Sequence, residues 1–505
     1  MASKSKKRQK QDASNIKITN DIISGRTSVG MPKRPKQSQA NRIGGGAAAD
    51  EQGYLTSCYI RLLRILLPGI LAELSLLEDP RDQSKIKHSL PALILYGILI
   101  FLNHIESRRA ANREIGGSEL SGLMHEFVPD FKSMPHADTT ARLLEGMDTN
   151  ELETKYEGMV GVFIKSPQFK ELNPGLIQVV VDATEKFMRD WCWDIRAQSR
   201  NAGDPGKERY FAYMLESVLI LGNGIVLPLL TEPLENGEHL DGGGKQDCEQ
   251  NAFKRIVVRL KRLFGNNPLM ITADGLYATG PVISLCNNYN WEYMITLKED
   301  CLASVWEDFN GLRKLEKENV KYSDIDGRRQ EYHWSNELEY IYGKNNKLLS
   351  LNVVTCKETW FEESKRKGKP CEKTTKYAWL SSSKLNAENV VNLCKKARKR
   401  WCIENHFLTV KKQGYKYEHC FSYNWNAMKG FHCLAKIAFF INTVILQNQA
   451  MQKFVAAEGK RGIIKKVWGY LRYNKLSDFC PLLNPDSICR VWKKVNFRKL
   501  ELKMV

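Results

Sequence analysis

The sequence predicts an α/β protein with a mixed β-sheet flanked by helices, a helical N-terminal domain and a β-rich insertion domain. Strand-like and helix-like segments alternate between about residues 173 and 298. Before them, apolar residues recur with helical spacing, and after them short strand-like pieces are separated by polar turns. Strands that alternate with helices indicate a layered sheet, which makes this stretch the predicted core.

Length, charge and cysteine usage narrow the classes of protein. At 505 residues the chain is too long for one ordinary core, so we expect two to four domains. Its formal net charge of +19 favours a polyanionic partner, because cations that neutralise phosphates release counterions. A basic protein without a nucleic-acid partner is the alternative. The 13 cysteines form no CxxC pair, which predicts reduced thiols in a cytoplasmic protein.

The N-terminal third is predicted to hold a basic arm and a helical domain. Residues 1–52 are rich in Lys, Arg, Ser, Gln and Gly, so we expect a disordered arm that either contacts DNA or solubilises the chain. Residues 53–168 are predicted to be helical. Their apolar run Leu90–Leu102 is shorter than the roughly 20 residues that span a membrane and predicts a buried core helix. Asp138 is the expected N-cap of a helix after Pro135, in either a helix-turn-helix-like DNA reader or a packing domain.

The first core segment, residues 169–300, has a defined order of elements. A strand within GLIQVVVDATE ends at Asp182, and two further strand-like runs follow it. A helix, a strand that ends at Asp274, a second helix and a final strand complete the segment. This order matches the ribonuclease-H-like fold.

The rest of the chain divides into an insertion, a second core segment and a tail. Residues 301–380 carry strand-like pieces between polar turns and are predicted to form the β-rich insertion domain. Residues 381–450 return to the core with a helix that begins near Asn386 and carries Glu404. Residues 451–505 form a basic tail.

The positions of three carboxylates, Asp182, Asp274 and Glu404, are not explained by a structural role. An acidic residue at the end of a buried strand is costly unless it is paired or binds a metal. Two such strands and a helical carboxylate supply the oxygen ligands of a divalent-metal site, as used for two-metal phosphoryl transfer on nucleic acid. We therefore expect Asp182, Asp274 and Glu404 to converge.

The helix around Glu404 carries a stripe of charges. Arg400, Glu404 and Lys411 lie at positions i, i+4 and i+11, within roughly 40° of one another around the helix. The stripe therefore holds a carboxylate between two cations. Taken alone, it is also explained by ordinary surface salt bridges.

The spacing Arg400-x3-Glu404-x6-Lys411 resembles the Tyr-x2-Arg-x3-Glu-x6-Lys signature of DDE transposases of the insertion-sequence-four family. In that family the third catalytic carboxylate lies in this motif, and a β insertion domain precedes it. The separation of Asp274 from Glu404 fits such an insertion and does not fit the shorter gap of retroviral integrases. The signature Tyr position is Ala397 here, which indicates a divergent subgroup.

The resemblance covers about residues 173 to 450 and implies a function. It makes Asp182, Asp274 and Glu404 the catalytic and metal-binding residues around two Mg²⁺ ions, for which Mn²⁺ can substitute. It makes Arg400 and Lys411 DNA-binding residues that hold phosphates near the element's end.

The implied protein binds terminal inverted repeats, cleaves double-stranded DNA at the element's ends and joins 3′-hydroxyls to target DNA. It acts as a homodimer in the synaptic complex and is associated with the nucleoid in the prokaryotic cytoplasm. The alternatives are a ribonuclease-H-fold nuclease without strand transfer and a domesticated DNA-binding protein without catalysis.

Other candidate residues have simpler interpretations. Asp247 and Glu249 precede a helix and are expected to cap it, with membership of the metal site as the less favoured alternative. Packing is favoured over base stacking for the tryptophans of the insertion, and over a zinc site for the cysteine and histidine residues near Glu404. These residues are Trp334, Trp360, Trp379, Cys402, His406, His419, Cys420, His432 and Cys433.

Overall fold

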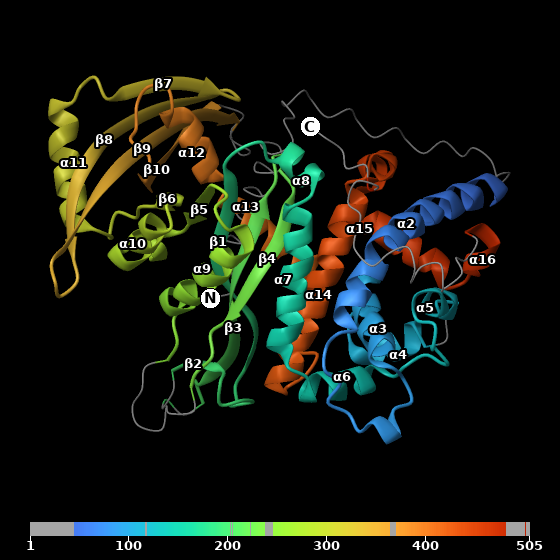
Figure 1. The fold of residues 1–505 in the computed structure, drawn as a ribbon. Helices are drawn as coiled ribbons and strands as arrows, with labels where there is room; N and C mark the ends of the chain where they lie inside the picture. Colours follow the sequence, from blue (N-terminus) through green and yellow to red (C-terminus); the bar gives the residue numbers. More distant parts are fainter. Residues whose placement is uncertain are drawn as a thin grey trace.

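A mixed sheet runs through the protein and joins the predicted core to the predicted insertion (Figure 1). The computed structural model describes residues 45–116, 119–201, 204, 206–222, 224–237, 246–363, 370–480 and 500. Within these residues ten strands lie in the order β2-β3-β1-β5-β6-β10-β9-β8-β7, with β4 paired to β3. The strands are β1 (Ile177–Arg189), β2 (Gln198–Arg200), β3 (Arg209–Ile220), β4 (Val226–Pro233), β5 (Leu269–Ala273), β6 (Glu292–Thr296), β7 (Val320–Ile325), β8 (Arg328–Tyr342), β9 (Lys347–Glu363) and β10 (Pro370–Ser381).

The N-terminal region is helical, as predicted. Helix α2 begins at Gly45, inside the predicted arm, and the arm's residues 1–44 lie outside the described residues. Helix α3 is buried at every position but Pro91, which confirms the predicted core helix. The helices are α2 (Gly45–Leu74), α3 (Leu90–Leu102), α4 (Arg108–Glu114), α5 (Ser121–Phe127), α6 (Ala137–Gly146), α7 (Thr149–Ile164) and α8 (Pro167–Leu172).

The predicted cap of α6 is wrong. The N-cap is His136, whose ring nitrogen accepts the backbone N–H of Asp138 at 3.3 Å. The Asp138 carboxylate instead pairs with Arg108 of α4 at 3.1 Å. Helix α6 packs its buried face against α3 and α14 (Trp425–Leu446).

Two helical segments, Glu51–Leu74 and Trp425–Leu446, are long and apolar enough to cross a membrane. In their most apolar stretches, 83% and 89% of the residues are buried inside the protein. Figure 1 shows α14 beside α7, between the sheet and helices α2 and α3, and shows α2 next to α3 and α15 (Gln449–Leu471). Both segments are therefore core helices of this fold.

The core follows the predicted order of strands and helices, with α9 (Glu249–Phe264) and α10 (Gly280–Asn288) flanking β5. One boundary was wrong, because β1 does not end at Asp182. It continues for seven residues, paired with β3 as far as Arg189 opposite Tyr210, whereas its parallel neighbour β5 stops at Ala273. Asp182 thus lies where β1 loses one of its two neighbours.

The insertion continues the core sheet. Strand β10 pairs with β6 through Trp379 opposite Thr296, and β9, β8 and β7 follow outward. Helix α11 (Ala303–Leu315) packs on β8. Trp334 and Trp379 are buried in a hydrophobic cluster, and Trp360 lies under the Arg328 guanidinium at 4.6 Å.

The segment expected to be one helix from Asn386 is two helices, α12 (Val390–Arg398) and α13 (Trp401–Lys412). Between them the hydrogen bonds span three residues, as in Arg400 N–H to the Ala397 carbonyl at 3.1 Å. This tighter turn re-aims α13. After α14, the chain continues through α15 and α16 (Leu476–Phe479), and residues 481–499 and 501–505 of the predicted tail lie outside the described residues.

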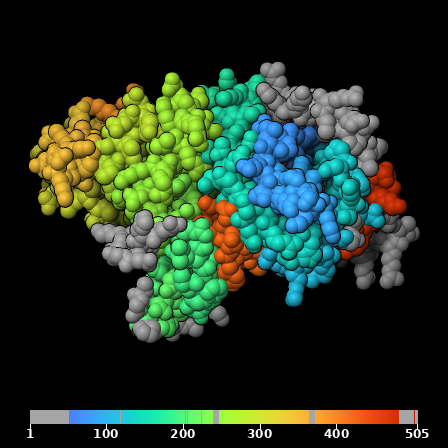
Figure 2. Space-filling model, turned by 60° about the horizontal axis from the view of Figure 1, so that its bottom comes forward, coloured from blue at the N-terminus to red at the C-terminus, as the bar shows by residue number. Residues whose placement is uncertain are grey.

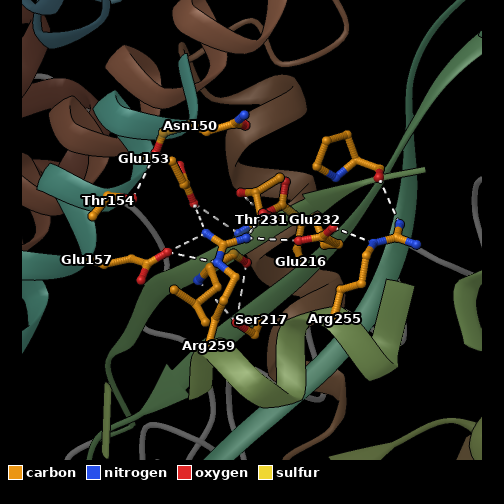
Figure 3. Close-up of polar contacts among 12 residues, drawn as sticks. Asn150, Glu153, Thr154, Glu157, Glu216, Ser217, Thr231, Glu232, Arg255 and Arg259 are labelled. Atoms are coloured by element: carbon orange, nitrogen blue, oxygen red, sulfur yellow. Dashed lines mark hydrogen bonds and ion pairs between the residues drawn. The ribbon is translucent and has the colours of Figure 1, made fainter. Parts of the chain in front are cut away.

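A network of side-chain ion pairs joins α7 to the core (Figure 3). Arg259 of α9 pairs with Glu157 at 2.6 Å and Glu153 at 3.1 Å, both on α7, and with Glu232 of β4 at 3.0 Å. Arg255, one turn earlier on α9, pairs with Glu232 at 2.6 Å. A cation shared by three carboxylates fixes the helical region to the sheet.

The network reaches β3 through Glu216. The Thr231 hydroxyl donates to this carboxylate at 2.7 Å, His432 of α14 lies 3.2 Å from it, and Lys436 contacts Thr231 at 3.0 Å. We call these residues the ion network: Glu153, Glu157, Glu216, Thr231, Glu232, Arg255, Arg259, His432 and Lys436.

Candidate active site

The parallel pairing of β1 and β5 brings the two predicted aspartates side by side. Val181 pairs with Ala273 at the end of that register, and Asp182 and Asp274 follow these residues directly. Neighbouring strands lie about 4.8 Å apart, so both aspartates emerge at the same edge of the parallel pair. Strand register alone is sufficient to bring them together.

The turn after β5 fixes the Asp274 carboxylate. Asp274 is the N-cap of the short helix η3 (Gly275–Tyr277), and its Oδ1 accepts the backbone N–H of Leu276 at 2.9 Å. Lys298, which follows β6, has its Nζ 3.5 Å from Oδ2. A Cβ on Gly275 would lie 2.7 Å from the Lys298 side chain, so glycine permits this close approach.

The Asp182 carboxylate is poorly neutralised. Burial, helped by the negative charges of Asp274 and Glu249, raises the pKa of Asp182 to about 7, although Arg400 opposes the shift. The ion pair with Arg400 is long, at 3.5 Å between Nη1 and Oδ2. The side chain is still 21% exposed, so a further cation can reach it from solvent.

Glu249 is a further carboxylate of the site. Its Oε1 accepts the Tyr213 hydroxyl at 2.6 Å, and its Oε2 accepts the Tyr277 hydroxyl at 2.8 Å. Burial, followed by contact with Glu249, raises the pKa of both tyrosines, so they remain hydrogen-bond donors. Glu249 does not cap α9, whose N-cap is Cys248, but it lies in the first turn, where its negative charge favours the helix dipole. Two tyrosines hold the carboxylate beside Asp182.

The expected cap at Asp247 is also absent from the structure. Its carboxylate pairs with Arg255 at 2.7 Å and accepts the backbone N–H of Cys248 at 2.9 Å. Asp247 therefore extends the ion network, whereas Glu249 belongs to the aspartate pair.

The α13 stripe joins the site through Arg400. This residue pairs with Asp182 and also donates through Nη2 to Oε1 of Glu404, whose side chain is 55% exposed. Asp182 and Glu404 are therefore separated by one guanidinium group. In the described part of the chain, no three His, Cys, Asp or Glu side chains are arranged to hold one metal ion.

Lys411, the last residue of the stripe, lies beside the extension of β1. Its Nζ is 3.5 Å from Oε1 of Glu418 and 5.8 Å from the centre of the Tyr417 ring. Together with Lys186 and Arg189 of β1 it lines a groove of about 480 Å³. Of the predicted site residues, Asp182, Asp274, Glu404 and Arg400 form one connected group, and Lys411 belongs to this groove.

A larger cavity, of about 970 Å³, lies between the core and the insertion strands. Its lining includes Lys298 and Arg400, the two cations that contact the aspartates. Tyr377 stacks on Trp379 with ring centres 5.6 Å apart, and Trp401 meets Tyr377 edge-on at 5.8 Å. Cations and aromatic rings thus surround a space that opens beside the carboxylates.

The histidines near Glu404 make packing and hydrogen-bond contacts. His406 meets Phe439 edge-on with ring centres 4.7 Å apart, and His419 meets Phe421 at 4.8 Å. His432 belongs to the ion network. Cys402 and Cys433 are buried, and Cys420 is half-buried.

Two family models match the chain. Residues 245–441 match the model described as Transposase DDE domain, and residues 71–158 match the model described as DDE_Tnp_1-associated. The first match contains Asp274, Arg400, Glu404 and Lys411, and Asp182 precedes it. No curated protein matches the chain.

Proposed function

Because the chain belongs to the DDE-type transposases, we propose that it cleaves DNA at the ends of its own element and joins the 3′-hydroxyls to target DNA. The observation that carries this proposal is the β1–β5 register, which sets Asp182 beside Asp274 with too few cations to neutralise them. Such a carboxylate pair suits a hard cation with oxygen ligands. Its substrate would be double-stranded DNA, and its working form a homodimer on two ends.

We propose that the site takes two Mg²⁺ ions, with Mn²⁺ as a substitute, once its carboxylates move closer together than they lie in the structure. Asp182, Asp274 and Glu404 would hold them, and when bound they would activate the attacking hydroxyl and stabilise the leaving oxygen. Arg400 holds Asp182 and Glu404 apart in the structure. We propose that this guanidinium turns to a DNA phosphate, which frees both carboxylates and positions the phosphodiester.

The test replaces each carboxylate by its amide, in Asp182→Asn, Asp274→Asn and Glu404→Gln. Cleavage of a labelled duplex carrying the element's end is measured in Mg²⁺ or Mn²⁺, and binding is measured by mobility shift in Ca²⁺. We expect each variant to lose cleavage by roughly 10³-fold or more and to retain binding. Glu388→Gln, at an exposed carboxylate before α12, is the matched control and should cleave normally.

Other outcomes point to other functions. Cleavage without joined products would indicate a nuclease, and binding without cleavage by the unaltered protein would indicate a domesticated DNA-binding protein. Normal cleavage by a folded Glu404→Gln protein would remove Glu404 from the site and make Glu249 the third carboxylate. Lys411→Ala should weaken end binding as well as cleavage, because its cation would act on phosphate.

A further inference from the structure

The extension of β1 beyond Asp182 builds a projection from the body of the protein. We call residues 183–200 and 209–214, which hold the end of β1, β2 and the start of β3, the finger. Figure 2 shows it as the green projection, with an orange segment from the start of α14 packed against its base. Strand pairing between β1, β2 and β3 supports it. Because Asp182 also lies on β1, this strand runs without a break from the aspartates into the finger.

Two exposed aromatic side chains lie where the finger meets the segment that leads into α14, one just after β1 and one just before α14. Trp191 is 48% exposed and Tyr423 is 44% exposed, and their ring centres are 5.2 Å apart. We call this pair the aromatic patch. It rests on buried rings, since Trp193 lies 6.4 Å from Tyr423 and stacks on Trp425 at 5.3 Å. The patch is therefore an exposed aromatic surface supported from beneath by buried rings.

A cation accompanies the patch. Arg189 donates through Nε to the Tyr423 hydroxyl at 2.8 Å, and its guanidinium lies 5.4 Å from the centre of that ring. Among the residues that the structure describes, no carboxylate forms an ion pair with Arg189. Its Nη1 donates to the Met188 carbonyl at 2.7 Å, and the remaining N–H groups can be offered to phosphate.

A groove with more cations than carboxylates lies beside residues 185–189 of β1, which stand between Asp182 and Trp191 in the chain. The groove beside β1 is lined by Lys186, Arg189 and Lys411, and also by the carboxylates Glu185 and Glu418. Glu185 is paired with Arg200 at 3.2 Å, and Glu418 is shared by Lys412 at 2.6 Å and Lys411 at 3.5 Å, so cations outnumber carboxylates here. The charge left to a partner in this groove is positive, which favours a polyanion over an apolar or acidic protein surface.

We propose that duplex DNA leaving the cleavage point lies along β1 and that the aromatic patch contacts it about 7 base pairs away. This inference rests on the proposed function. Arg189 lies seven residues beyond Asp182, or about 23 Å at the rise of a β-strand. At about 3.4 Å per base pair, this distance corresponds to about 7 base pairs. Arg189 would contact phosphate and the aromatic rings would pack against deoxyribose, and neither contact requires a particular sequence.

The test combines a substitution with DNA length. The probe is a fluorescent duplex of the inverted repeat that flanks the gene, shortened stepwise from either side of the cleavage point. In Ca²⁺, Trp191→Ala and Tyr423→Ala should each weaken binding about tenfold on duplexes that extend 12 base pairs past the cleavage point on the side that lies along β1, because apolar contact area is lost. On duplexes cut back to 4 base pairs on that side, the variants and the unaltered protein should bind equally, because the patch has nothing to contact.

Matched variants separate the patch from general effects. Trp191→Phe keeps an aromatic face and should retain most of the affinity, and Tyr473→Ala removes an aromatic side chain at the end of α15 that is more exposed than either patch residue. A loss that is the same at every DNA length, or equal to that of Tyr473→Ala, would overturn the proposed path. So would a change from dimer to monomer without DNA in sedimentation of Trp191→Ala, which would make the patch a contact between copies.

The outcomes also distinguish this inference from the function on which it rests. If the unaltered protein cleaves the end duplex but the variants show no dependence on length, only the DNA path is wrong. If the unaltered protein neither binds nor cleaves the end duplex, the proposed function fails and the path fails with it.

Discussion

The ion network and the candidate active site both gather carboxylates on neighbouring strands, but only the network neutralises them. Asp182 of β1 and Glu216 of β3 are direct partners across the two strands. Contacts with His432, Lys436 and Thr231 outweigh the effect of burial and lower the pKa of Glu216 to about 2. Burial raises the pKa of Asp182 to about 7. The pKa values of these two neighbouring acids are therefore shifted in opposite directions.

The difference lies in the cations that the protein supplies. In the network, Arg259 lies within 3.1 Å of three carboxylates, and Lys436 contacts Glu153. In the site, Asp182 and Asp274 each have one cation at 3.5 Å. Carboxylates that pair with cations of the protein stabilise the fold. Carboxylates that the protein neutralises only in part are suited to bind a metal ion from solution.

The largest expected effect is on the network. Arg259→Met should lower the free energy of unfolding by about 3–5 kcal/mol, because the buried Glu157 and the half-buried Glu153 and Glu232 would lose the cation that they share. Thermal or urea unfolding measures the loss. Arg255→Met is the control, since its side chain is 42% exposed compared with 18% for Arg259, and should cost much less. Equal losses from the two substitutions would show that burial of the Arg259 ion pairs adds nothing to their contribution to stability.

The second-largest expected effect is on how the stability of the protein changes at acidic pH. The folded pKa of Glu216 lies below its unfolded value, so its contribution to stability is present above about pH 4.5 and is lost as the pH falls toward 2. The contribution is on the order of 3 kcal/mol. Groups that face it are His432, Lys436 and Tyr417. Unfolding of Glu216→Gln should depend less steeply on pH in this window, and an unchanged slope would contradict the assigned pairing.

The fold could be predicted further than the site, because helix and strand periodicity is a local property. The order from β1 to β6 follows from alternating apolar runs, and the register that joins Asp182 to Asp274 follows from two strands of one sheet. The end of β1 was misplaced because its last residues, such as Lys186 and Arg189, are polar and line a groove. The break before α13 has no Pro or Gly to signal it.

Glu249 shows what sequence reasoning missed at the site. Its two donors, Tyr213 and Tyr277, lie 36 and 28 residues away on different elements. Nothing within the α9 sequence distinguishes a carboxylate held by distant tyrosines from one that caps the helix. The bridging position of Arg400 was equally hidden, because the helical stripe predicted its contact with Glu404 but not its contact with Asp182.

Metal binding should separate the two regions with a somewhat smaller effect. Mg²⁺ at a hundredfold excess over its Kd should stabilise the protein by about 2.7 kcal/mol, seen as a rise in Tm. Asp182→Asn should abolish this rise, because the amide lacks the charge that holds the ion. Glu232→Gln, in the network, should keep it. A rise that survives in Asp182→Asn would place the metal elsewhere.

The smallest expected effect is a gain in stability without metal. Burial raises the folded pKa of Asp182 above its unfolded value, so this group costs stability as the pH rises toward 7 and keeps that cost above it. In EDTA at pH 8, Asp182→Asn should therefore raise the free energy of unfolding by about 1 kcal/mol, a figure reduced for the solvent that reaches this side chain. Asp274→Asn should bring no gain, since Asp274 caps η3 and pairs with Lys298. The gain of Asp182→Asn should shrink as the pH falls toward 4, where the folded carboxyl is already neutral and the unfolded one becomes so. A loss of stability in Asp182→Asn at pH 8 would mean that Arg400 neutralises this carboxylate as fully as Arg259 neutralises its partners, and the comparison between the two regions would fail.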